Sequence, residues 1–125
     1  MQGVDKRRTA RVAINFKVKL DTIRGTFNGV GRDISEGGIG VYLEKLPPLN
    51  SSVGVRFSFP DIDDEIKITG EVMYHRRGEP GVYDDWVGVK FLRMDSFSQT
   101  TIHKFIKTNY DSSQPLMHTP PPLPK

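Results

Sequence analysis

The chain has 125 residues, 36% of them hydrophobic, and its 18 Lys and Arg exceed its 15 Asp and Glu by a formal net charge of +3. This length fits one domain with a modest core, and the small basic excess does not describe a general nucleic-acid coat. The lack of cysteine excludes disulfides and thiolate metal sites. The sequence contains no long apolar run of the kind that directs secretion or spans a membrane. We therefore expect a cytoplasmic protein without membrane insertion.

Alternation of apolar and polar side chains predicts the first strand over residues 12–20. A period of two is typical of a strand that buries one face. In the next predicted strand, Gly29 and Gly31 indicate a bulge or a sharp bend. Six such short strands, at near-regular spacing and separated by turn residues, predict a mainly β fold, a small antiparallel barrel. The five later strands are expected at about 26–33, 39–43, 53–59, 66–74 and 87–91.

The hydrophobic period changes after the last predicted strand. Ile102, Phe105 and Ile106 mark one face of a helix predicted over residues 97–109, and Ser96 with Gln99 resembles a capping box. From residue 111 onward the chain is rich in proline, which predicts a disordered tail over 111–125. We therefore expect three parts: a flexible basic N-terminal arm over 1–11, a barrel domain with its helix over 5–110, and the tail.

The first of two chemically informative clusters is the R-x-x-x-R sequence from Arg7 to Arg11, which lies before the first strand and follows Lys6. The planar guanidinium of Arg presents several donors at once and also stacks on rings. It pairs with guanine O6 and N7 and with phosphate oxygens. Arg8 adds a third cation, which could face a ligand or water.

The second cluster is D-x-S-x-x-G at a predicted turn, from Asp33 through Ser35 to Gly38. Asp33 offers acceptors for guanine N1–H and N2–H, and Ser35 can donate to a ligand or bond its own turn. Gly37 and Gly38 are expected to take positive φ and to bring the backbone close to a ligand. Separately, the clusters are more typical of a solvated arm and a self-capped turn. Together, beside strands of one barrel, they predict a site for a small anion with guanine and phosphate groups.

The two motifs, in this order, resemble those of the PilZ domain family. Arg7 and Arg11 match the family's R-x-x-x-R, and Asp33, Ser35 and Gly38 match its [D/N]-x-S-x-x-G. The resemblance covers about residues 5–110, and 87–91 is also similar to the family's last strand. It implies a six-stranded PilZ-like β-barrel with a C-terminal helix that binds bis-(3′-5′)-cyclic dimeric GMP (cyclic di-GMP). In that case the two arginines would clamp guanine and phosphate groups, while the aspartate and serine would read a guanine edge.

Within this family, the residue before R-x-x-x-R influences whether one ligand or an intercalated pair is bound. Here it is Lys6, and we expect Lys6 and Arg8 to favour the pair, because stacked ligands carry twice the phosphate charge. Tyr74 is a secondary candidate on the fifth strand, although its alternation with Val72 favours the core. The resulting hypothesis is a non-catalytic cyclic di-GMP receptor whose arm changes conformation on binding and relays the signal to a protein partner.

Three other functions are an enzyme, a barrel that binds nucleic acid and an adaptor that needs no ligand. An enzyme is disfavoured because the three histidines are scattered and no carboxylates have acid–base or metal-ligand spacing, so neither a metal nor a cofactor is expected. A barrel for single-stranded nucleic acid would expose aromatic platforms. Here Phe16, Phe57 and Phe59 fall in register with core residues, so no DNA or RNA is expected. A PilZ-type interaction adaptor that needs no ligand stays open, and the sequence names neither the partner nor the oligomeric state.

Overall fold

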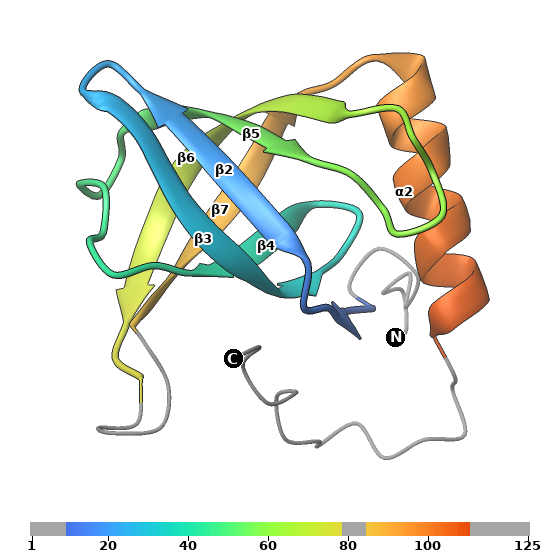
Figure 1. Ribbon diagram of the computed structural model, residues 1–125, viewed down its shortest axis with the longest axis horizontal. Helices are drawn as coiled ribbons and strands as arrows, with labels where there is room; N and C mark the ends of the chain where they lie inside the picture. The colour runs from blue at the N-terminus through green and yellow to red at the C-terminus, as the bar shows by residue number, and fades with distance from the viewer. Residues whose placement is uncertain (1–9, 79–84, 111–125) are drawn as a thin grey trace, which may run out of the picture.

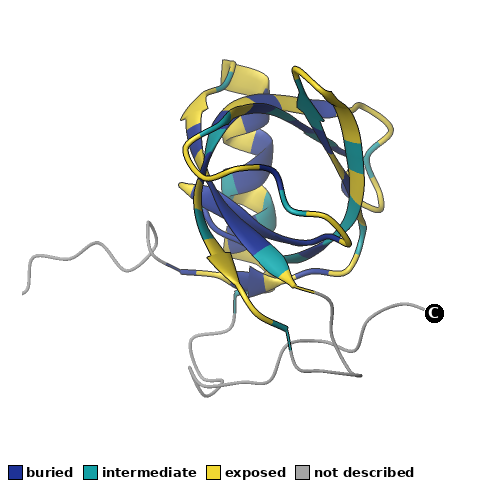
Figure 2. Cartoon of the chain, turned by 90° about the vertical axis from the view of Figure 1, so that its left-hand side faces the viewer, coloured by how far each residue is buried: buried dark blue, intermediate teal, exposed yellow. Residues whose placement is uncertain are grey.

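The computed structural model describes residues 10–78 and 85–110. The strands pair antiparallel in the order β1-β3-β2-β5-β6-β7-β4, and the pairing of β3 with β4 closes the barrel (Figure 1). Figure 2, turned by 90°, shows the closed ring of strands with the helix beyond it. The prediction of a mainly β, six-stranded antiparallel barrel with one C-terminal helix is confirmed. In chain order the elements are β1 (Val12–Ala13), β2 (Lys17–Thr22), β3 (Gly25–Ile34), β4 (Gly38–Tyr42), β5 (Ser52–Phe57), β6 (Ile66–Arg76), β7 (Trp86–Arg93) and α2 (Ser96–Asn109).

The first predicted strand is divided into β1 and β2, which both pair with β3. Val12 lies opposite Ile34, but Lys17 lies opposite Val30, so the chain between β1 and β2 holds one residue more than its partner. The ladder continues around the extra residue, since Ile14 N donates to the carbonyl of Arg32 at 3.1 Å. The two pieces therefore form one interrupted strand, which is why seven strand segments make a six-stranded barrel.

Bulges in the later strands change which face a side chain occupies. The register of β3 against β4 shifts between Gly31 and Asp33, which confirms the irregularity expected from the glycines of this strand. The register of β6 against β7 shifts between Val72 and Tyr74. One added residue reverses the alternation of inward and outward side chains beyond it. The two shifts therefore decide which side chains of β3 and β6 reach the outer surface, beside β4 and β7.

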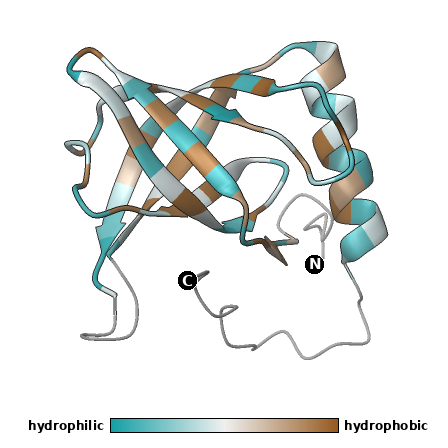
Figure 3. Ribbon diagram, viewed as in Figure 1, coloured by the Kyte–Doolittle hydropathy of each residue, from teal (hydrophilic) through white to brown (hydrophobic). Residues whose placement is uncertain are grey.

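The core fills the barrel with the apolar half of each alternating pattern. Figure 3 shows apolar and polar residues following one another along β2, and Figure 2 shows which residues around the ring of strands are buried. Burial of each large aliphatic side chain contributes roughly 1.5–3 kcal/mol to stability. This inner layer holds the strands in register while leaving their outer faces free for chemistry. The fully enclosed aliphatic residues include Val18, Leu20, Ile34, Ile39, Val41, Val55, Ile66, Val72 and Val87.

Helix α2 lies at one end of the barrel (Figure 1). Ile102 and Ile106 are buried, and the ring of Phe105 stacks on Phe59 with centroids 4.3 Å apart. Phe16 and Phe57 join this aromatic cluster at 5.5 Å. These rings pack together with the helix, in agreement with their predicted place in the core. Among the described residues, no helix has the length and apolar character to cross a bilayer.

The predicted cap of this helix was one residue too late. Asp95, rather than Ser96, is the N-cap: its backbone is extended, and its carboxylate accepts from Ser98 N at 2.7 Å. A carboxylate at this position satisfies an amide that the first helical turn leaves unpaired. The same hydrogen bond lowers the pKa of Asp95.

Candidate ligand-binding site

The D-x-S-x-x-G residues form the tight turn that joins β3 to β4. Ser35 is 4% exposed; its amide donates to the carbonyl of Gly38 at 2.9 Å, and its hydroxyl accepts from Gly37 N at 3.2 Å. The carbonyl of Gly37 in turn accepts from Phe91 N on β7 at 2.9 Å. Ser35 thus caps its own turn, as the more conservative interpretation expected, and the turn is fixed to two neighbouring strands.

Arg11 connects the basic cluster to this turn. Its Nε and Nη2 donate to Oδ1 of Asp33 at 3.1 and 2.8 Å, and its Nη1 donates to Oγ of Ser35 at 3.2 Å. The side chain of Arg11 is 40% exposed, whereas that of Asp33 is 13% exposed. One guanidinium therefore donates hydrogen bonds to both a carboxylate and a hydroxyl, and it is still partly exposed to solvent.

A groove of about 320 Å³ opens beside Arg11 and Ser35. Its floor lies where the outer faces of β4, β7 and β6 meet. A Cβ on Gly88 would lie 2.2 Å from Cζ of Tyr74, so the tyrosine ring lies directly on the glycine backbone. The absence of a side chain at this position gives the groove an aromatic wall. It is lined by Arg11, Ser35, Gly37, Gly38, Met73, Tyr74, Gly88, Val89 and Lys90.

The prediction that Tyr74 lies in the core is wrong, and the bulge in β6 explains why. Val72 pairs with Val89, but Tyr74 pairs with Gly88, one step further along β7. The extra residue, Met73, reverses the alternation, so Tyr74 shares the outer face with Gly88. Tyr74 is half-buried and lines the groove, which is where a secondary site residue would have to lie.

The expected positive φ of the two motif glycines is also wrong. Among the described residues, the glycine with positive φ is Gly25, at 123°. Gly38 is needed for space instead, because a Cβ there would lie 2.6 Å from the carbonyl oxygen of Val89. A Cβ on Gly37 would meet nothing within 4 Å. Gly38 thus allows β4 to approach β7, while Gly37 leaves the turn backbone open.

Cations and aromatic rings alternate across the outer face next to the groove. The guanidinium of Arg32 lies 4.1 Å above the ring centroid of Trp86, and that of Arg76 lies 4.2 Å from Tyr74. The two rings meet edge-on at 5.7 Å. On β4, Tyr42 lies opposite Trp86 of β7. This arrangement places polarisable rings and fixed positive charge beside the carboxylate of Asp33.

Part of this surface is predictable from the sequence. The structure brings Arg11, Asp33, Ser35, Gly37 and Gly38 together, whereas Lys6, Arg7 and Arg8 lie outside the described residues. Six residues of this surface were missed: Arg32, Met73, Trp86, Gly88, Val89 and Lys90. A signal existed for Lys90 alone, since it is the polar position within the alternating run of β7.

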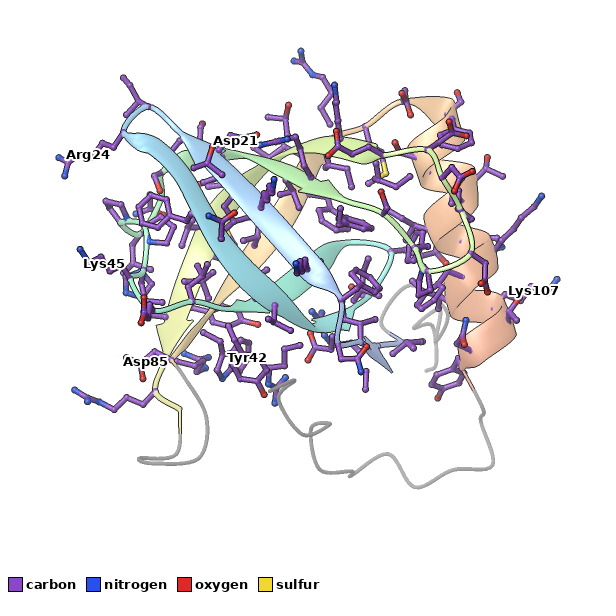
Figure 4. The ribbon with its side chains drawn as sticks, viewed as in Figure 1. Asp21, Arg24, Tyr42, Lys45, Asp85 and Lys107 are labelled. Atoms are coloured by element: carbon purple, nitrogen blue, oxygen red, sulfur yellow. The ribbon has the colours of Figure 1, made fainter. Side chains whose placement is uncertain are left out.

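A larger cavity, about 520 Å³, is lined by residues of β2, β5 and β6 and by those just before α2. In Figure 4, Asp21 of this cavity lies on the upper side of the barrel, and Tyr42 lies on the lower side. Arg56 here already pairs with Asp21 and Glu65. Its hydrogen bond to Asp21 is the largest cause that lowers the pKa of that carboxyl to about 2. Within residues 10–78 and 85–110, no three His, Cys, Asp or Glu side chains are grouped to hold a metal.

The smaller groove is thus the cavity that residues of both motifs line. The model of the PilZ domain matches residues 5–108. The chain belongs to the PilZ domain family. This is a family of cyclic di-GMP receptors, as predicted from the two motifs. No curated protein matches the chain in sequence.

Solved structures share the PilZ fold at low sequence identity. MotI/DgrA, the inhibitor of motility from Bacillus subtilis, is 15% identical with a TM-score of 0.72 over 86% of this chain and 53% of its own. The chain thus spans about half the length of MotI. The PilZ domain of Escherichia coli YcgR, solved with cyclic di-GMP, is 13% identical with a TM-score of 0.63 over 79% and 87%. The PilZ domain of CeSA, from a cellulose-synthesising bacterium, is 15% identical with a TM-score of 0.58 over 78% and 95%.

Proposed function

We propose that this PilZ protein is a non-catalytic, cytoplasmic receptor that binds cyclic di-GMP in the groove between Arg11 and Tyr74. The observation that carries the proposal is the meeting of Arg11, Asp33 and Ser35 at the edge of that groove. A planar cation lies within hydrogen-bonding distance of both a carboxylate and a hydroxyl. Together the three groups match the donors and acceptors of guanine and phosphate.

Each group has a distinct role in the proposed complex. The carboxylate of Asp33 accepts from N1–H and N2–H of one guanine. Arg11 donates to guanine O6 and N7 or to a phosphate oxygen, a common geometry for this side chain. Lys90 brings a further cation from β7, and the ring of Tyr74 offers a surface against which a base can pack.

Binding requires Arg11 to exchange partners. In the structure its guanidinium is satisfied by Asp33 and Ser35, so the ligand must replace these hydrogen bonds with its own. We propose that Arg7 and Arg8 join Arg11 on the ligand, so that the arm over residues 1–11 changes conformation. The altered charge and shape of this face then relay the signal to a protein partner. The free energy available for that change is limited to the preference of the ligand for the bound conformation.

The proposed stoichiometry is two ligands per protomer. Lys6 and Arg8 would supply the positive charge that an intercalated pair needs, because the pair carries twice the phosphate charge of one ligand. Saturation at one ligand per protomer would contradict this part of the proposal and would leave the receptor role intact.

Isothermal titration of the purified chain with cyclic di-GMP tests the function, with GTP and cyclic GMP as controls. We expect micromolar or tighter binding that is selective for cyclic di-GMP. Absence of heat, together with an unchanged melting temperature, would contradict the receptor role. The protein would then be a ligand-independent PilZ-type adaptor, and its function would rest on protein partners alone.

A further inference from the structure

The bulge in β3 places two adjacent side chains on the same outer face of the barrel. In a regular strand, Arg32 and Asp33 would point to opposite faces. Here the register against β4 shifts between Gly31 and Asp33, and Nη1 of Arg32 donates to Oδ2 of Asp33. Arg32 is not part of either motif, yet it contacts the motif carboxylate directly.

Arg32 is itself held on two sides. Its guanidinium lies on the ring of Trp86 at 4.1 Å, and its carbonyl accepts from Ile14 N at 3.1 Å. Its side chain is 25% exposed, against 40% for Arg11. Stacking of a guanidinium on an indole fixes the plane of its donors. Arg32 is therefore the more confined of the two cations that contact Asp33.

The two arginines occupy different oxygens of the carboxylate. Arg11 binds Oδ1 through two donors, and Arg32 binds Oδ2. Oδ1 of Asp33 also lies over the bare backbone of Gly40, 2.9 Å from the position that a Cβ would take there. A carboxylate held at three points has a defined direction, which reading a guanine edge requires.

We propose that Arg32 is a positioning residue of the groove: it holds Asp33 oriented and charge-compensated while Arg11 turns from Asp33 to the ligand. This inference rests on the proposed cyclic di-GMP site. Without Arg32, Asp33 would keep Arg11 as its one cationic partner among the described residues. Arg11 would then be harder to release, and the carboxylate would lose its direction once released. Both effects lower affinity for a ligand that displays a guanine edge.

Titrations of Arg32→Gln with cyclic di-GMP and with cyclic di-AMP test the role. Adenine lacks the N1–H and N2–H donors that Asp33 is proposed to read. We expect about a tenfold loss of affinity for cyclic di-GMP, the usual scale for a hydrogen bond to a charged group. Affinity for cyclic di-AMP should fall by much less, because its adenines do not depend on the direction of the Asp33 carboxylate, so that the selectivity falls. Equal losses for both ligands, or no loss for either, would overturn the inference.

Three further variants separate positioning from folding. Arg76→Gln removes a matched cation that lies over a ring but contacts no carboxylate within the described residues, and it should keep selectivity. Arg32→Lys retains the positive charge but loses the planar stacking on Trp86. Its affinity for cyclic di-GMP should lie between those of the wild type and Arg32→Gln. On an Asp33→Asn background, Arg32→Gln should have no further effect on affinity, and additive losses would contradict the role. A wild-type chain that fails to bind cyclic di-GMP refutes the receptor itself, which is a different outcome.

Discussion

Arg11, just before β1, donates two hydrogen bonds to a single oxygen of Asp33, 22 residues further along the chain. The pair is partly exposed, and such ion pairs contribute only about 0–1 kcal/mol to stability. A ligand that offers phosphate oxygens to the arginine and ring donors to the aspartate can therefore separate them at small cost. In the proposed mechanism, the pair keeps the two oppositely charged groups beside the groove before cyclic di-GMP binds.

Arg11→Ala should weaken binding of cyclic di-GMP by about 2 kcal/mol or more, roughly a 30-fold loss. The reason is the removal of a charged donor fork that is proposed to bind the guanine or the phosphate of the ligand. Calorimetric titration measures the loss. Lys107→Ala, at an exposed cation on α2 (Figure 4), is the control and should bind as wild type. Unchanged affinity of the Arg11 variant would remove this residue from the site.

Asp33→Asn should weaken binding of cyclic di-GMP mainly through loss of guanine reading. The amide keeps the size of the side chain, but it replaces one acceptor oxygen with a donor that faces the guanine donors. Affinities for cyclic di-GMP and cyclic di-AMP should therefore approach each other. An equal loss for both ligands in the same titrations would be inconsistent with a base-reading role.

Gly38→Ala should destabilise the fold by about 1–3 kcal/mol, whereas Gly37→Ala should be close to neutral. At Gly38 the new Cβ would meet a backbone oxygen of β7 at 2.6 Å, which a side-chain rotation cannot relieve. At Gly37 the space is open. Chemical unfolding of the two variants measures the difference. Similar free energies of unfolding would show that β4 and β7 are not packed as closely as described.

Asp21 should make the fold sensitive to acid. Hydrogen bonds from Arg56 and Thr26 lower its pKa from 3.8 to about 2. Because the folded pKa is depressed, the stabilisation is present above about pH 4 and is lost as the pH falls toward 2. The side chain is 38% exposed, so after allowance for solvent screening the effect is about 1 kcal/mol or less.

Asp21→Asn should therefore lower stability at pH 7 and lose its effect near pH 2, as unfolding curves at several pH values will show. Affinity for cyclic di-GMP should not change, because Asp21 lines the other cavity. A constant difference in stability across this pH range would rule out the titration of Asp21 as its cause.

The sequence predicted the barrel because alternation along residues 12–20 and the later runs records which face is buried. It also predicted Asp33, Ser35 and Gly38, because they are close together in one motif. It could not place Tyr74, since the bulge in β6 reverses the alternation without a local signal. The glycines of β3 indicated a bulge, but neither its exact position nor that it would bring Arg32 to the outer face. Trp86 and Gly88 were missed because their contacts to Arg32 and Tyr74 arise only when the barrel closes.

Amide chemical shifts recorded by NMR during titration of the full chain with cyclic di-GMP locate the ligand directly. We predict that the largest changes fall on the turn over residues 33–38 and on Gly88 and Lys90. The chemical shifts of the amides around Asp21 and Arg56, beside the other cavity, should change little. Changes concentrated at that other cavity, or no changes at saturating ligand, would contradict the assignment of the groove as the cyclic di-GMP site.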